Sequence, residues 1–325
     1  MPLKRGISLP KIIITVSHRI DTDSKTVDCP IYLPLRSGAA FDTRCESCIP
    51  GDDTGDNISE KNRAYSEFTA EYWAWKNVDA DYYGMCHYRR YFSFADKHYR
   101  TPKHDKMIHD ALLDQKSISR YRLDDTERIS AALSEHDAVI PTPIDVRELP
   151  TKKGIKNTLH EMWDAYTDFY LGELPFSSAV LEIIKDVTPD YAENTEAYLN
   201  GTLHRSFNCF IMKKERYFEL CEFTFKVMGE FEKRADALGV PLPLRFVGYV
   251  GELLNGIFIH RMLTVYGDNC LEKQLVFFHD TKIYRKTPRF LRLKFRISRI
   301  FGAIISFFFP RGSKRRARLK KLLKI

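Results

Sequence analysis

The chain has 325 residues, of which 44% are hydrophobic and 13% aromatic, a composition that favours a globular protein with a substantial core. No stretch approaches the roughly 20 apolar residues that a membrane-spanning helix needs, and the apolar run at 12–16 is too short for a secretory signal. Seven cysteines, with Cys86 and Cys209 inside apolar runs, predict reduced thiols in a cytosolic protein rather than a disulfide framework.

The net charge of +8 is distributed unevenly along the chain. No acidic residue follows Asp280, whereas the segment after it contains 16 of the 51 lysines and arginines. The preceding part therefore has 35 basic against 43 acidic residues, a net charge of −8. We expect an acidic globular domain over residues 1–280 and a basic tail over residues 281–325.

The first predicted element is a buried parallel strand at residues 11–17, a run rich in β-branched side chains. It ends at Ser17, His18 and Arg19. Ligands of open α/β sheets bind just beyond the carboxyl ends of the strands. These three residues are therefore candidates for ligand binding.

A polar loop at residues 51–62 comes next and leads into a helical pattern at residues 65–75. The loop is too polar and too rich in glycine for a helix or a strand. Two interpretations stay open, a turn that caps the following helix and a loop that binds a ligand. The residues concerned are Asp52, Asp53, Asp56, Asn57, Lys61 and Asn62.

A second apolar strand is predicted at residues 82–86, and it ends abruptly in His87, Tyr88, Arg89 and Arg90. Packing gives little reason to place two arginines and a histidine at the exit of a buried strand. Guanidinium groups bind phosphate oxygens in bidentate geometry, so this strand end indicates an anion site. The alternative is that an arginine pairs with the acidic loop for structural reasons.

Residues 94–128 have no clear periodicity and resemble an exposed insertion, with a helix from Asp105 onward. A further buried strand follows at residues 138–141. The chain thus continues the alternation of strands and helices that is typical of an α/β protein.

A compact strand is predicted at residues 208–212, beginning with Asn208, and an amphipathic helix at residues 215–233 follows it. The last helix of the globular part comes after Arg245 and has Glu252 near its start. A glutamate at this place interacts favourably with the helix dipole, which is its structural interpretation.

Several segments together resemble one family of bacterial polysaccharide-biosynthesis proteins. The central ones are GDDTGDNISEKN, YWAWKN and YYGMCHYRRYF, and the others are ITVSHR, IYLPLRSGAA, HDAVIP, NCFIMKKERYFELCEFTF and RFVGYVGELL. They follow one another over roughly residues 10–265, which makes the series far more specific than a single motif. The family, catalogued as domain of unknown function 4422, is regarded as glycosyltransferases of capsule, O-antigen and exopolysaccharide assembly.

The resemblance implies an α/β fold of the GT-A-like (Rossmann) type, a nucleotide-sugar-binding sheet flanked by helices, followed here by a basic amphipathic tail. It also implies a hexosyltransferase that uses a nucleotide-diphosphate sugar. We expect a UDP-sugar, such as UDP-galactose in its pyranose or furanose form, and a lipid-linked glycan as the acceptor. An inverting reaction needs a general base, and by its position in the family pattern Glu252 is the acid that we assign to this role.

For a transferase of this kind, the strand-end residues have expected roles as well. Arg89 and Arg90 are expected to stabilise the departing diphosphate electrostatically. The remaining expected donor-binding residues are Ser17, His18, Arg19, Asp52, Asp53, Asp56, Asn57, Lys61, Asn62, His87, Tyr88, Asn208 and Arg245.

Metal dependence stays open in the sequence. Related enzymes usually place Asp-x-Asp at the strand end where this chain has His87 and the arginines, so we expect the arginines to neutralise the diphosphate without a metal. Mn²⁺ or Mg²⁺ bound through His87 is the alternative. We expect no metal at Asp21 and Asp23, which follow the first strand, or at Cys45 and Cys48, which lack a second pair.

The tail contains the run FGAIISFFF at residues 301–309 between basic segments. This run is too short to span a bilayer but suits burial at its interface, with arginines reaching the headgroups. We therefore expect a cytoplasmic protein bound peripherally to the anionic inner face of the cell membrane. The rival interpretation is a non-catalytic peripheral membrane or nucleic-acid-binding protein. Three consecutive phenylalanines and the lack of an RNA-reading module favour membrane over nucleic acid.

Overall fold

The structure is a computed structural model, and it describes residues 10–20, 24–43, 49–151, 153–282, 288–309, 313, 315, 316 and 318. Asp21, Asp23, Cys45 and Cys48 lie outside the described residues. The strands are β1 (Ile12–Arg19), β2 (Tyr32–Ser37), β3 (Tyr82–His87), β4 (Arg90–Phe92), β5 (Ile108–Leu112), β6 (Ala138–Pro141), β7 (Ile144–Asp145), β8 (Tyr170–Leu171), β9 (Leu174–Pro175), β10 (Leu203–His204), β11 (Phe210–Lys213), β12 (Cys270–Lys273) and β13 (Leu275–Asp280).

The α-helices are α1 (Asn62–Tyr65), α2 (Phe68–Asn77), α3 (Gln115–Tyr121), α4 (Thr126–Glu135), α5 (Leu159–Thr167), α6 (Phe176–Val187), α7 (Ala192–Asn200), α8 (Lys214–Ala237), α9 (Phe246–Arg261) and α10 (Pro288–Phe308). Short 3₁₀ turns are η1 (Ala39–Phe41), η2 (Ser59–Lys61), η3 (Val146–Glu148) and η4 (Pro189–Tyr191), and η5 (Met262–Tyr266) is a π-helical turn after α9.

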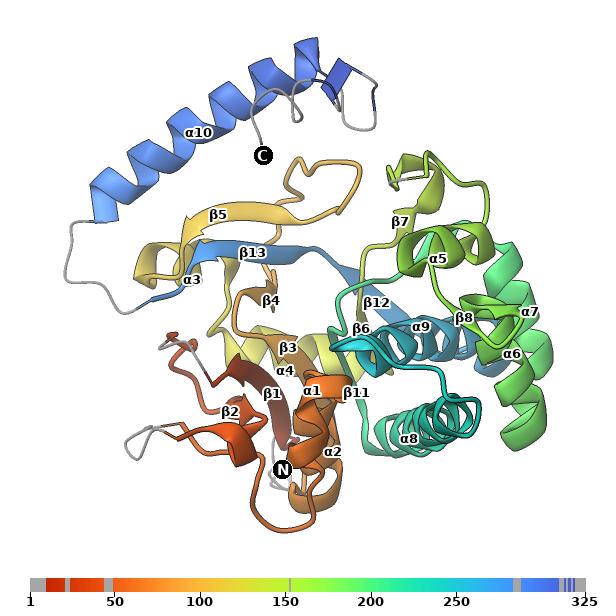
Figure 1. Ribbon diagram of the computed structural model, residues 1–325. Coiled ribbons are helices and arrows are strands. Elements are labelled where there is room, and N and C mark those ends of the chain that lie inside the picture. The colour runs from red at the N-terminus through yellow and green to blue at the C-terminus, as the bar shows by residue number, and fades with distance from the viewer. Residues whose placement is uncertain are drawn as a thin grey trace, which may run out of the picture.

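A nine-stranded mixed sheet forms the centre of the molecule (Figure 1). β1 lies between β2 and β3 and is parallel to both. Beyond β3, β11 runs antiparallel, and β6 and β12 complete that side. On its other route the sheet continues from β3 through β4 to β13 and β5. The predicted α/β class, a sheet flanked by helices, is confirmed.

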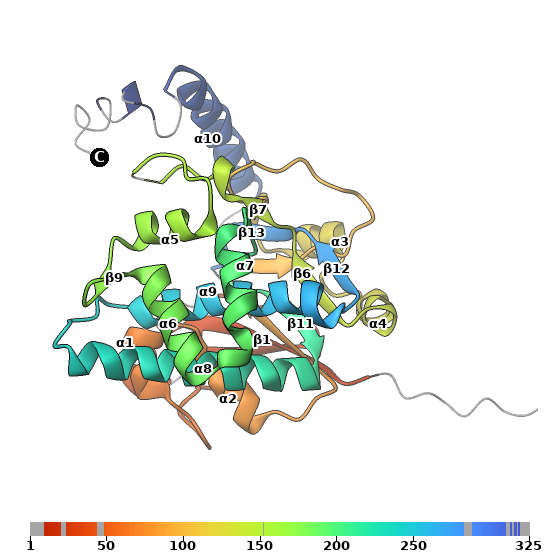
Figure 2. The same cartoon turned by 90° about the vertical axis from the view of Figure 1, so that its right-hand side faces the viewer.

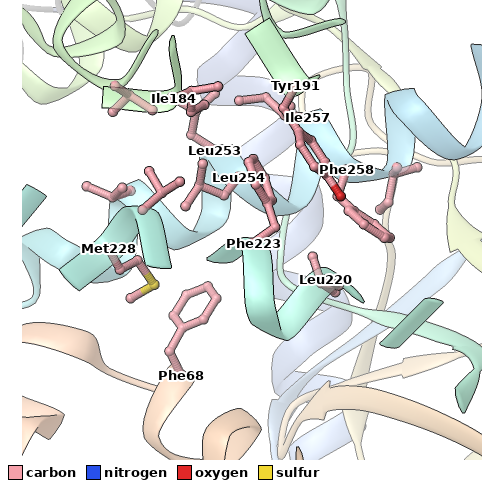
Figure 3. Packing of buried hydrophobic residues seen from close by; sticks show 14 of the residues in the cluster. Phe68, Ile184, Tyr191, Leu220, Phe223, Met228, Leu253, Leu254, Ile257 and Phe258 are labelled. Atoms are coloured by element: carbon pink, nitrogen blue, oxygen red, sulfur yellow. The ribbon is translucent and has the colours of Figure 1, made fainter. Parts of the chain in front are cut away.

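The larger hydrophobic core lies between the sheet and a layer of helices formed by α6, α8 and α9. α9 is apolar on nearly all sides, and twelve of its sixteen residues are buried, as expected for a central helix. Figure 2 shows α6 and α7 on the outer side of α8 and α9. Figure 3 shows the contacts, in which Leu253, Leu254, Ile257 and Phe258 of α9 meet Leu220, Phe223 and Met228 of α8 and Ile184 of α6.

This core stabilises the part of the chain that holds α9. Burying a side chain of the size of Leu or Phe contributes about 1.5–3 kcal/mol. α9 is therefore held firmly in place. The position of Arg245 and Glu252, which both lie at the start of α9, is fixed with it.

Two predicted helical stretches differ from the structure. The helix expected from Asp105 onward is wrong, because residues Ile108–Leu112 form β5, which pairs in parallel with β13 near the end of the globular part. Pairing between segments so distant along the chain leaves no local signal. The helix at 65–75 is present but divided into α1 and α2, since Ser66 between them has φ 56° and ψ −133°.

α10 lies across the end of the molecule near β5, above the sheet in the view of Figure 1. Arg292 of α10 forms an ion pair with Asp114, at a distance of 2.7 Å. In the part of the chain that the structure describes, no helix combines the length and apolarity needed to cross a membrane.

Two glycines provide a matched test of the packing around α9. A Cβ at Gly251 of α9 would lie 2.6 Å from Cε2 of the buried Phe68, whereas a Cβ at Gly229 of α8 would meet no atom within 4 Å. We expect Gly251→Ala to lower the free energy of unfolding by about 1–3 kcal/mol through overpacking. Gly229→Ala should raise it by up to about 1 kcal/mol, because alanine favours a helix.

Urea unfolding followed by circular dichroism measures both values. A Gly251→Ala variant as stable as the unchanged protein would contradict the close packing of α9 on α2.

Candidate functional site

A cavity of about 490 Å³ opens at the carboxyl ends of β1, β2 and β3. Its lining residues are Ser17, His18, Arg19, Ile20, Ser37, Asn62, Arg63, Ser66, Glu67, His87, Arg89, Arg90, Leu244 and Arg245. This is the edge at which open α/β sheets bind ligands. Eight of the predicted site residues therefore lie around one cavity, Ser17, His18, Arg19, Asn62, His87, Arg89, Arg90 and Arg245.

The register of two parallel strands brings the predicted strand-end residues together. Ser17 of β1 lies opposite His87 of β3, so both strands leave the sheet at the same level. The end of β2 reaches the same place, where the Oγ atoms of Ser17 and Ser37 are 2.6 Å apart. Segments that are distant along the chain thus meet because parallel strands align their carboxyl ends.

Five arginines line the cavity, and Glu67 is the one carboxylate among its described lining residues. Arg89 and Arg90 form no ion pair with a described carboxylate, and the Nε atom of each is buried without a hydrogen-bond partner. Both guanidinium groups pack instead on the ring of Phe277 in β13, at 5.1 and 5.7 Å from its centroid. The two arginines therefore have unused donors and a charge that no direct ion pair within the described residues neutralises, as expected of an anion site.

The two histidines of the cavity add no positive charge at neutral pH. Burial lowers the pKa of His18 to about 4, and burial together with Arg90 and Arg89 lowers the pKa of His87 well below its usual value. Nε2 of His18 is 2.7 Å from Oγ1 of Thr26, and its Nδ1 is buried without a partner. Tyr88 packs against both rings, with centroids 5.7 Å from His18 and 4.3 Å from His87.

Non-glycine residues with positive φ gather beside the cavity. They are Ser66 (56°), Phe207 (83°), Asn208 (45°) and Arg245 (65°). Such conformations cost about 1–3 kcal/mol each and persist only where the surroundings fix them. Here Nδ2 of Asn62 donates to the carbonyl of Ser66 at 2.7 Å, and Nε of Arg245 donates to Oγ of Ser66 at 2.6 Å.

Glu67 connects the strained segments to one another. Its Oε1 accepts a hydrogen bond from Nδ2 of Asn208 at 3.1 Å, and its Oε2 lies 3.7 Å from a guanidinium nitrogen of Arg245. Asn255 of α9 holds the amide of Asn208 in turn, because Nδ2 of Asn255 donates to Oδ1 of Asn208 at 3.4 Å. Asn208 therefore contacts a carboxylate of the cavity, although it does not line the cavity itself.

Glu252 lies in the second turn of α9 and is not among the residues that line the cavity. Its Oε1 accepts a hydrogen bond from the backbone N–H of Phe207 at 3.0 Å. Burial raises the pKa of Glu252, and Glu67 raises it further, while the Phe207 N–H, Arg90 and Arg245 act in the opposite direction. The carboxyl group is thus electrostatically coupled to the arginines and has a pKa above the ordinary value, which suits a proton acceptor.

The acidic loop leads into η2 and α1, and its aspartates are not among the residues that line the cavity. Asp52 is fully buried and accepts hydrogen bonds from the backbone N–H groups of Gly38 and Ala39 and from the hydroxyl of Ser59. Asp52 therefore has a structural role, but it holds the start of η1, which precedes it in the chain, and not the start of the helix after the loop, as the structural interpretation predicted.

The other loop residues also contact groups of the protein. Oδ1 of Asp56 accepts from the hydroxyl of Tyr72 at 3.1 Å, and Oδ1 of Asn57 accepts from the N–H of Ser59 at 3.2 Å. Lys61 forms an ion pair with Glu232 of α8 at 2.6 Å. Asp53 is exposed. Of the predicted loop residues, Asn62 alone lines the cavity.

No group of three or more His, Cys, Asp or Glu side chains is placed to hold a metal ion within the described ranges. The pairs Asp21/Asp23 and Cys45/Cys48 are outside these ranges.

Besides Ile20, Ser37 and Leu244, three neighbouring residues that line the cavity were not identified in the sequence, namely Arg63, Ser66 and Glu67. All three lie in or next to a stretch with helical periodicity, in which polar residues are expected on a solvated face. The break of the helix at Ser66 is what turns Glu67 toward Asn208 and Arg245. No local signal in the sequence marks that break.

Comparison with known proteins places the chain in a family. It matches the family described as "Domain of unknown function (DUF4422)" over residues 11–262. It is also similar to the apo structure of the bifunctional glycosyltransferase WbbM, with a TM-score of 0.70 and 25% identity over 83% of this chain and 46% of that chain. No curated protein matches it. The structural likeness confirms the predicted GT-A-like fold. Because the family match covers most of its length, the chain belongs to the DUF4422 family.

Proposed function

We propose that the chain is an inverting hexosyltransferase that moves a sugar from a UDP-sugar, with UDP-galactose in pyranose or furanose form as the expected donor, to a lipid-linked glycan. The pathway would be capsule, O-antigen or exopolysaccharide assembly. The observation that supports this most is the cavity at the strand ends, where Arg89 and Arg90 have charge and donors without a partner. Similarity to a bifunctional glycosyltransferase, of which the chain spans 46%, supports the same class of reaction.

The arginines account for the leaving group. Departure of a nucleoside diphosphate leaves negative charge on its phosphate oxygens, and preorganised cations stabilise that charge without reorganisation during the reaction. Arg89 and Arg90 are fixed by their ring contacts with Phe277, and Arg245 by its hydrogen bond to Ser66. We propose that these cations take the role that a divalent metal has in many related enzymes.

Glu252 is the proposed general base. The acceptor hydroxyl has to lose its proton as it attacks the sugar, and a carboxylate of raised pKa near the arginines meets this need. Glu67, which lines the cavity, is the nearest other carboxylate to consider because it contacts Asn208 and Arg245.

The acceptor side is proposed to lie around Tyr166 and Tyr249. Their rings meet edge to face with centroids 5.5 Å apart, and Tyr166 is exposed by 56%. Partial burial of its hydroxyl, the neighbouring Tyr249 and the negative charge of Glu252 together raise the pKa of Tyr166 to about 12. The tyrosine pair therefore lies near the proposed base. Aromatic faces are suitable surfaces for the apolar side of a sugar ring.

The location that we propose is the inner face of the cell membrane. α10 exposes six large apolar side chains, Phe290, Leu293, Ile297, Phe301, Ile305 and Phe308, which are exposed by 43–65%. Together with its basic residues this makes an amphipathic helix of the kind that lies in a membrane interface. A lipid-linked acceptor would be met at that surface.

The first test is donor binding by isothermal titration calorimetry of UDP with wild type and Arg89→Ala, with Mn²⁺ and with a chelator. Loss of one charge-assisted contact, worth about 1.5–3 kcal/mol, should weaken binding between about tenfold and a hundredfold, with or without metal. Arg147→Ala is the matched control, since Arg147 pairs with Asp145 outside the cavity.

Binding that survives Arg89→Ala or requires Mn²⁺ would contradict the arginine-based diphosphate site. If wild type bound no UDP under any condition, the donor proposal itself would fail.

The second test concerns the base. Glu252→Gln keeps an oxygen that can accept from the N–H of Phe207, so the fold should persist. We expect kcat to fall by about 10²–10⁴ while UDP binding is unchanged. Glu193→Gln, an exposed glutamate on α7, is the control. Full activity of Glu252→Gln together with an inactive Glu67→Gln variant would assign the base to Glu67 instead.

The pH profile provides an independent measurement of the same residue. A base acts only when deprotonated, and the pKa of Glu252 is raised above its ordinary value. As the pH falls, kcat/KM should therefore begin to decline at a higher pH than for an ordinary glutamate. An acid limb at or below the ordinary carboxylate pKa would argue against Glu252.

A further inference from the structure

A second cavity, of about 360 Å³, lies between the globular part and α10, and the proposed transfer reaction does not use it. β5, α3, the segment around Tyr99 and α10 form its walls. Its described lining contains one acid, Asp110, and six residues with a permanent positive charge, Arg100, Lys116, Arg120, Arg292, Arg296 and Arg299.

Only part of this positive charge is balanced within the protein. Oδ2 of Asp110 accepts from Arg120 at 3.0 Å and from the hydroxyl of Tyr121 at 2.8 Å. Arg292 pairs with Asp114 at 2.7 Å. The four other cations, Arg100, Lys116, Arg296 and Arg299, form no ion pair with a carboxylate of the described residues. The cavity therefore has an excess of positive charge contributed by both of its sides.

α10 is oriented with three of its arginines toward this cavity, whereas Lys294 is on the other side of the helix. Successive residues of an α-helix are rotated by about 100°, which places Arg292, Arg296 and Arg299 on the side opposite Phe290, Phe301 and Phe308. Phe295, on the cationic side, packs on His279 of β13 with ring centroids 4.7 Å apart. The apolar side is exposed. The helix thus lies between the cationic cavity and an outward apolar surface.

We infer that this cavity is a binding site for the headgroup phosphate of an anionic membrane lipid. The inference rests on the membrane association proposed above and adds a defined site to it. An interfacial helix buries its apolar side among the acyl chains and lies at the depth of the headgroups. Phosphate groups would then be level with the cationic side of α10. Arginine and lysine from both walls would complete their coordination.

The inference differs from a simple amphipathic anchor in one testable respect. An anchor of that kind needs α10 alone, whereas the site also needs cations of the globular part. Arg100 and Lys116 belong to the globular part and line the cavity. Both are exposed, so replacing them should leave the fold intact, as thermal unfolding would check.

The experiment is flotation of the full chain with phosphatidylcholine vesicles that contain or lack phosphatidylglycerol. The variant Arg100→Gln/Lys116→Gln should bind the anionic vesicles about fivefold more weakly for each residue lost. The control Lys185→Gln/Lys226→Gln removes the same charge from α6 and α8, far from α10 (Figure 1), and should bind as wild type does.

The outcomes separate the two proposals. A wild-type chain that does not bind anionic vesicles would end the membrane proposal and this inference with it. Wild-type binding that Arg100→Gln/Lys116→Gln leaves unchanged would overturn this inference alone and keep α10 as a simple anchor. If the cavity variant and the control lost vesicle binding equally, the binding would depend on total charge and not on a defined site, and the inference would also be overturned.

A soluble probe identifies the source of the phosphate. Short-chain phosphatidylglycerol below its micelle concentration should bind wild type and not the cavity variant in a calorimetric titration. Inorganic phosphate should bind much more weakly. If inorganic phosphate bound as tightly as the lipid, the site would serve a free anion and the lipid assignment would be wrong. Binding of a short RNA in preference to the lipid would overturn it too.

Discussion

The mutual repulsion of five guanidinium groups around one cavity is the constraint on which the rest of this structure depends. Like charges at such a place oppose folding unless other interactions hold them there. Arg89 and Arg90 are held by the edge of the sheet and by the ring of Phe277. Arg245 is held by a left-handed backbone conformation at the start of a helix that the core fixes firmly. The hydrophobic core between α6, α8 and α9 thus contributes the free energy that offsets the electrostatic repulsion among these arginines.

Two features of the structure limit the electrostatic repulsion among these arginines. The histidines of the cavity are buried in a manner that keeps them neutral, so they offer hydrogen bonds without adding charge. Glu67 and Glu252 contribute partial compensation, one in the lining of the cavity and one outside that lining. Neither carboxylate pairs directly with Arg89 or Arg90, which leaves the charge of these two arginines available for a ligand.

Much of the site could be predicted from the sequence because short stretches of sequence mark the residues at the strand ends. A β-branched run followed by Ser17, His18 and Arg19, and an apolar run followed by His87, Arg89 and Arg90, mark two strand ends, and parallel strands align such ends. The acidic loop could not be resolved in the same way. A buried Asp52 that accepts backbone N–H groups and an exposed ligand-binding aspartate have the same sequence pattern.

The remaining features depend on contacts between distant segments. Glu67 reaches the cavity because the chain turns sharply at Ser66, and that turn is stabilised by Asn62 and by Arg245, almost two hundred residues later. β5 forms because β13 is available as its partner. Local periodicity therefore predicts the first strands of the sheet more readily than the long-range contacts that complete the site.

β13 has a consequence for how the molecule would work on a surface. Phe277 and His279 are two residues apart on this strand, and their rings meet at 5.0 Å. Phe277 contacts two arginines of the cavity at the strand ends, and His279 contacts Phe295 of α10. One strand thus joins the arginines of that cavity, which we propose to bind the diphosphate, to the helix with the apolar face. If α10 lies in a bilayer interface as we propose, the strand would work as a spacer, and the height of the cavity above the lipid would follow from the fold.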